Sequence, residues 1–105
     1  MTTISETMEL KLIIHASTIA ALARARSNAA NLLATRPDAQ VRIVANAGAV
    51  SAALLHPDPR TDERLVLCHN SLASRGLQPG NLAVTPAAVL LIAELQAAGW
   101  AYMHA

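Results

Sequence analysis

The sequence predicts an α/β fold of three layers (α/β/α), with a mainly parallel sheet of five strands in the order 2-1-3-4-5. Short apolar runs that are typical of buried strands alternate along the chain with segments of helical periodicity. Hydrophobic residues make up 53% of the 105 residues but aromatic residues only 2%, so the core must consist of small and aliphatic side chains. This length predicts a single domain, with residues 1–8 as a flexible N-terminal segment.

The first strand and helix are predicted over residues 10–35. Residues 10–15, Leu-Lys-Leu-Ile-Ile-His, are almost continuously apolar, as in a parallel strand that is covered on both faces. Ser17 or Thr18 can cap the helix, and Pro37 ends it because the residue before a proline is forced out of the helical region. The expected buried stripe of this helix comprises Ile19, Leu22, Ala23, Ala29, Ala30 and Leu33.

Two further strand–helix units follow. Apolar runs predict the second and third strands, and proline and glycine mark the turns around them. We predict strands over residues 41–46, 65–68 and 82–84, short helices over 49–55 and from after Cys68 to Gly76, and turns at 47–48, 56–63 and 78–80.

The last helix has clear signals at both ends. Thr85 and Pro86 are typical of the N-cap and first helical position, and Gly99 is typical of the position just past the end. Residues 87–98 between them are apolar nearly all round, so this helix should be buried on more than one side, one of them against another subunit. Residues 100–103 form the fifth strand.

Four polar or reactive residues are expected to share the carboxyl edge of this sheet. With the order 2-1-3-4-5 the chain reverses direction between strands one and three, where parallel sheets of this kind bind ligands. His15 ends strand one and Cys68 ends strand three; Asn46 and Thr85 end strands two and four.

Cys68 is the only cysteine, and it precedes a predicted helix N-terminus. The amides of Asn70 and Ser71, with His15 or His69 as further hydrogen-bond partners, can lower the pKa of such a thiol and make it reactive. A buried, inert cysteine that serves as a small hydrophobic residue is an equally good interpretation. His15 and His69 can equally be rim residues without a role, and His56 and His104 are expected on the surface.

Several other functions find no support in the sequence. The net charge is only +1 with no basic run, so nucleic-acid binding is not expected, and Arg24 and Arg26 should lie on a solvated helix face. No histidine spacing suits a metal, no glycine-rich motif suits a nucleotide phosphate, and no cofactor is expected. No secretory signal or membrane span is evident, so we predict a cytoplasmic protein.

The region around the cysteine resembles the DsrE/DsrF-like family, which includes the sulfur-relay subunits of the TusBCD and DsrEFH complexes and the small YchN-like proteins. The resemblance is carried by residues 66–72, Val-Leu-Cys-His-Asn-Ser-Leu, followed by Arg75 and Gly76. It extends by order and spacing over roughly residues 10–104, although the family's Gly-Pro turn after strand two is replaced here by Asn46-Ala47-Gly48-Ala49.

The resemblance implies the α/β/α fold given above, assembly into homo-trimers or hexamers, and a sulfur-relay function. In that function Cys68 would accept sulfane sulfur as a persulfide from a donor protein and pass it to an acceptor. As to catalytic activity, the protein is predicted to be at most a sulfur carrier or a sulfurtransferase-like protein. The alternative is a non-catalytic, oligomeric binding or scaffold protein of the same fold, and a nucleotide-binding pocket is a weaker third hypothesis.

Overall fold

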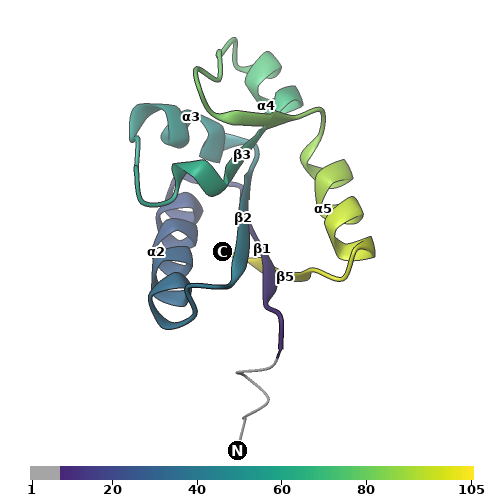
Figure 1. Cartoon of the computed structure of the whole chain (residues 1–105). Helices are drawn as coiled ribbons and strands as arrows, with labels where there is room; N and C mark the ends of the chain where they lie inside the picture. The colour runs from purple at the N-terminus through teal and green to yellow at the C-terminus, as the bar shows by residue number, and fades with distance from the viewer. Residues whose placement is uncertain (1–7) are drawn as a thin grey trace, which may run out of the picture.

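The computed structural model describes residues 8–105. Except for Met8, the predicted flexible segment lies outside the described residues. The fold is α/β, with five parallel strands that alternate with four α-helices, as the sequence predicts (Figure 1). The elements are β1 (Lys11–Ala16), α2 (Ile19–Thr35), β2 (Gln40–Ala45), α3 (Gly48–Leu55), the 3-10 turn η1 (Asp62–Arg64), β3 (Leu65–Cys68), α4 (His69–Ser74), β4 (Ala83–Thr85), α5 (Ala88–Ala97) and β5 (Ala101–His104).

The predicted strand order is wrong: the order is β4-β3-β2-β1-β5, so β2 is the middle strand rather than an edge. The prediction failed because β1 and β2 have equally apolar runs. Ile13 and Ile14 of β1 and Val41, Ile43 and Val44 of β2 are all at most 1% exposed, so burial alone suits either order. β1 and β3 are not paired with each other; both pair with β2.

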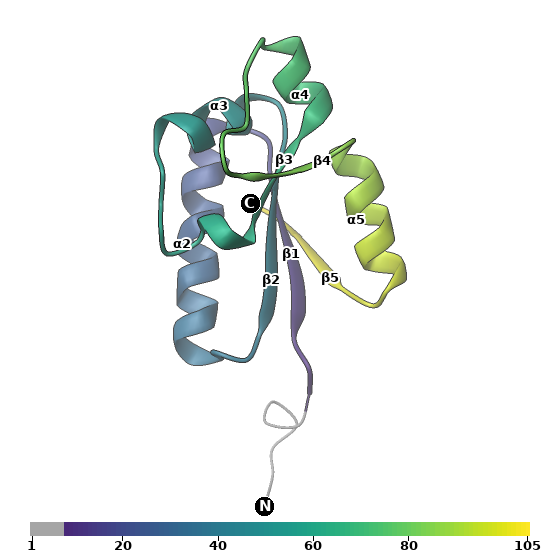
Figure 2. The ribbon, with the colours of Figure 1, turned by 45° about the horizontal axis from the view of Figure 1, so that its top comes forward.

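The helices divide unequally between the two faces of the sheet. In Figures 1 and 2, α2 and α3 lie on one face and α5 lies alone on the other. The main core fills the α2/α3 side. The α5 side holds only a small cluster of buried residues, with α5 residues and Trp100 packed against it. This cluster comprises Ile13, Val44, Cys68 and Ala88.

Thr18 caps α2 as predicted, accepting a hydrogen bond of 3.0 Å from the backbone N–H of Ala21. Gly99 ends α5 as predicted, with a φ of +95° just past the helix. The predicted start of α5 is wrong by two residues. Thr85 is still paired with Cys68 in the sheet, so the helix begins only at Ala88.

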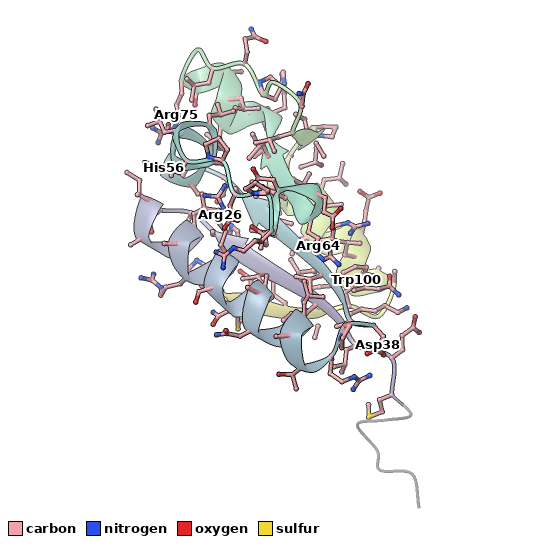
Figure 3. The ribbon with its side chains drawn as sticks, turned by 60° about the vertical axis from the view of Figure 1, so that its left-hand side comes forward. Arg26, Asp38, His56, Arg64, Arg75 and Trp100 are labelled. Atoms are coloured by element: carbon pink, nitrogen blue, oxygen red, sulfur yellow. The ribbon has the colours of Figure 1, made fainter. Side chains whose placement is uncertain are left out.

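Arg26 also lies elsewhere than predicted. It is 8% exposed, because it extends from α2 toward the loop before β3, where its Nη2 lies 3.0 Å from Oδ1 of Asp62 (Figure 3). Asp62 in turn accepts a hydrogen bond from the backbone N–H of Asp58. The buried face of α2 is therefore rotated about the helix axis relative to the predicted one. Ile19, which was predicted to be buried, is 64% exposed. The buried face comprises Ala21, Leu22, Ala25, Arg26 and Ala29.

No α-helix within residues 8–105 has both the length and the hydropathy needed to cross a bilayer.

Replacing Arg26 by alanine should lower the free energy of unfolding by about 2 kcal/mol, since it leaves the half-buried Asp62 carboxylate without its partner. Chemical denaturation measures this loss. Arg24→Ala on the exposed side of the same helix is the matched control, and it should change stability by less than about 0.5 kcal/mol. Equal effects of the two substitutions would contradict a structural role for the Arg26–Asp62 pair.

Candidate functional site

The carboxyl ends of the parallel strands lie along one edge of the sheet, and the predicted site residues lie there in two groups. Cys68 is the last residue of β3, and Thr85 is its partner at the end of β4. His15 lies near the end of β1, and Asn46 follows β2. The sequence predicted one cluster around the thiol. The structure instead joins His15 and Asn46 to each other, and the partners of Cys68 are backbone N–H groups and the Ser71 hydroxyl.

Cys68 is 5% exposed, and its surroundings act on the thiol in two opposing ways. Burial alone raises the pKa of the thiol. The backbone N–H groups of Ser71, Ala88 and Asn70 and the hydroxyl of Ser71 stabilise the thiolate and outweigh burial, so the net pKa of Cys68 lies below the usual value. The N–H of Ala88, at the start of α5, lies 3.4 Å from Sγ. The sulfur therefore joins two segments that are 20 residues apart in sequence.

Ser71 is oriented toward the sulfur by a second contact. Its Oγ accepts a hydrogen bond of 2.8 Å from the backbone N–H of Ala47, which leaves its proton free to donate to Cys68. Ala47 has a φ of +49° and a ψ of −134°, a conformation that costs a non-glycine residue about 1–3 kcal/mol. The strained turn after β2 thus supports the hydrogen-bonding environment of the thiol.

The other predicted supporting residues differ in what they do. The backbone N–H of Asn70 acts on the sulfur as predicted, while Cys68 itself occupies the N-cap position of α4, which begins at His69. His69 is exposed and lines a different hollow, together with Pro79 and Val84. The hydroxyl of Thr85 donates to the carbonyl of Ala87, 3.3 Å away, so it shapes the turn into α5.

His15 is the centre of the second group. Its Nε2 lies 2.9 Å from Oδ1 of Asn46, and its Nδ1 lies 2.8 Å from the hydroxyl of Tyr102 on β5. Because the Asn46 oxygen only accepts, Nε2 donates to it, while Nδ1 is hydrogen-bonded to the Tyr102 hydroxyl. The ring of His104 is 5.1 Å from that of His15. Within residues 8–105, neither His15 nor His69 hydrogen-bonds to the sulfur of Cys68.

Tyr102, Ala88 and Gln96 were missed by the sequence-based prediction, and they join His15 and Asn46 around a pocket of about 390 Å³. The sequence does carry a signal for Tyr102: it lies two residues before His104 in a strand, so the two side chains lie on the same face of the sheet. Within residues 8–105, no group of three His, Cys, Asp or Glu side chains is placed to hold a metal ion.

A comparison of the chain with protein-family models gives no match, and a search of curated proteins finds none with significant similarity.

The lowered pKa of Cys68 predicts a stability that depends on pH. Above the pKa of the unfolded thiol, about 8.5, the thiolate contributes its full stabilisation, and this is lost as the pH falls through the lower pKa of the folded state. The free energy of unfolding of the wild type, relative to Cys68→Ala, should therefore increase as the pH rises from the lowered pKa of the folded thiol toward about 8.5. Urea denaturation at several pH values measures it.

Ser71→Ala is the control for this effect, because it removes one donor to the thiolate and keeps the cysteine. The pH-dependent increase should become smaller in this variant. If the difference in the free energy of unfolding between the wild type and Cys68→Ala does not change with pH, the thiol has an ordinary pKa.

Proposed function

We propose that the protein is a sulfur-relay protein that carries sulfane sulfur as a persulfide on Cys68. The observation that carries the proposal is the set of donors around the sulfur: three backbone N–H groups and the Ser71 hydroxyl stabilise a thiolate at the end of β3. A thiolate is the nucleophilic form of cysteine, and persulfide chemistry requires it. The resemblance of residues 66–76 to the DsrE/DsrF-like family supports the same function.

The reaction needs one cysteine and no redox cofactor. The Cys68 thiolate attacks the terminal sulfur of a donor persulfide, R–S–SH; the donor S–S bond breaks, and R–S⁻ leaves with the electron pair. Cys68 becomes Cys–S–SH, whose anionic form is held by the same N–H groups. An acceptor nucleophile then takes the terminal sulfur and releases the Cys68 thiolate. The chain has no other cysteine that could expel the sulfur by forming an internal disulfide.

Intact mass measurement tests this proposal. The protein is incubated with a cysteine desulfurase and cysteine, alkylated and weighed. We expect a gain of one sulfur atom that maps to Cys68, is absent from Cys68→Ala and is slower in Ser71→Ala. No gain under conditions that load an established carrier would overturn the proposal.

The protein is further proposed to act as a homo-oligomer, in the cytoplasm, with α5 as the contact between copies. Of the ten residues of α5 only Ala88 is buried; Val89 is 76% exposed and Leu90 48% exposed. An apolar helix that covers one face of a sheet and is itself uncovered is typical of a surface that a second copy buries. The same surface suits the alternative function of an oligomeric scaffold, in which Cys68, 5% exposed, only fills space.

Leu90→Glu should therefore shift the protein from a trimer or hexamer toward the monomer, since it places a charge in an apolar contact. Analytical ultracentrifugation measures the mass. Leu55→Glu, on a leucine that is 74% exposed at the end of α3, is the matched control and should leave the assembly unchanged. A wild-type monomer at all concentrations, or an equal response of both variants, would contradict assembly through α5.

A further inference from the structure

The two groups of site residues meet at the peptide group between Asn46 and Ala47, in the turn between β2 and α3. On one side of this turn, Oδ1 of Asn46 lies 2.9 Å from Nε2 of His15. On the other side, the N–H of Ala47 donates to Oγ of Ser71 over 2.8 Å, and the Ser71 hydroxyl in turn acts on the sulfur of Cys68. The histidine and the thiol are therefore connected through two consecutive residues.

The orientation of this peptide group is held at both of its ends. Its carbonyl, which belongs to Asn46, accepts a hydrogen bond of 3.1 Å from the N–H of Ala49, and its N–H donates to Ser71. Because a peptide group is planar, the direction of the Ala47 N–H follows from the conformation of Asn46. The hydrogen bond between the Asn46 side chain and His15 therefore also helps to direct that N–H toward Ser71.

The backbone of Ala47 shows that this turn needs contacts from outside. Its φ of +49° and ψ of −134° are unfavourable for a residue with a Cβ, and such a conformation persists only where the surrounding structure holds it. Asn46 lies just past β2, which ends at Ala45, so the hydrogen bonds of the sheet do not orient its side chain. The contact with His15 supplies that restraint on the N-terminal side of the strained residue.

Both ring nitrogens of His15 are used, so the ring is held in one orientation. Nε2 donates to Asn46, and Nδ1 is hydrogen-bonded to the hydroxyl of Tyr102, 2.8 Å away. The pairing of β1 with β5 does not require these bonds, because residues 12–15 and 101–104 pair through their backbones. A ring whose two nitrogens both bind neighbouring side chains is better suited to hold those side chains than to bind a ligand.

We propose that His15 and Asn46 are positioning residues for the thiol, held by Tyr102 and acting through the turn after β2. A serine side chain has three staggered rotamers, and the N–H in this turn favours the one in which the Ser71 hydroxyl can donate to the sulfur. The inference rests on the proposed function, since a donor to the thiolate matters only where the thiolate reacts.

The rate of alkylation of Cys68 by iodoacetamide as a function of pH tests this role in the full chain. His15→Leu removes the donor to Asn46 and should move the midpoint of the profile upward, toward that of Ser71→Ala. Below the midpoint the rate should fall about threefold or more, as for the loss of one hydrogen bond. His15→Gln keeps an N–H₂ group that can donate to Asn46 and does not titrate, so its midpoint should stay closer to the wild type. Equal midpoints in the wild type and His15→Leu, or equal shifts in the leucine and glutamine variants, would overturn the proposal.

A double-mutant cycle separates positioning from a general loosening of the fold. If Asn46 acts through Ser71, Asn46→Ala should raise the midpoint in the wild type and add little to it in Ser71→Ala. A shift of the same size in both backgrounds would contradict this route. His104→Ala is the matched control: it removes an exposed ring whose centroid is 5.1 Å from that of His15, and it should leave the midpoint unchanged. An equal shift in this variant would show an effect of the nearby ring and overturn the proposal.

Sulfur loading of the wild type is a separate result. A wild type that gains sulfur, together with unchanged midpoints in His15→Leu and Asn46→Ala, overturns the positioning role alone. A wild type that gains no sulfur overturns the proposed function, even where His15→Leu moves the midpoint.

Discussion

The central position of β2 determines where the other elements of this fold lie. β1 and β3 pair with its two edges, and the chain reaches the β4 edge with α2 and α3 on one face. α5 then crosses the other face to bring β5 beside β1. Two local arrangements follow from that crossing: the N–H of Ala88 meets the Cys68 sulfur, and Tyr102 meets His15. The thiol environment and the neighbouring pocket therefore both depend on the middle strand.

The thiol combines burial with stabilisation of its charged form. Burial by itself favours the neutral thiol, as it would for a cysteine that only fills space. Here the donors come from two separate segments, α4 and the start of α5, and one of them, Ser71, is oriented by the strained Ala47. A purely space-filling cysteine has no need of such an arrangement. Strain and convergent donors are instead typical of functional positions, where the rest of the fold stabilises a locally unfavourable geometry.

Local features were predictable from the sequence, and pairing between distant segments was not. The Thr18 cap, the Gly99 stop and the alternation of strands and helices depend on neighbouring residues, and all three are confirmed. The apolar runs of β1 and β2 are so alike that the sequence does not show which strand is central. The wrong strand order is also the reason that Tyr102 was not predicted as a site residue. In the predicted order β5 is far from β1, whereas in the structure the two strands pair and Tyr102 reaches His15. The burial of Arg26 depends on Asp62, 36 residues away, and has no local signal.

The proposed function depends most on the lowered pKa of the Cys68 thiol, and the rate of its alkylation as a function of pH tests this directly. The chain has one cysteine, so the rate of mass gain with iodoacetamide reports on that thiol alone. We predict a rate profile with its midpoint below about 8.5, the value of a free cysteine, and a higher midpoint in Ser71→Ala. A wild-type midpoint at or above that value would contradict the central claim and favour a cysteine that only fills space.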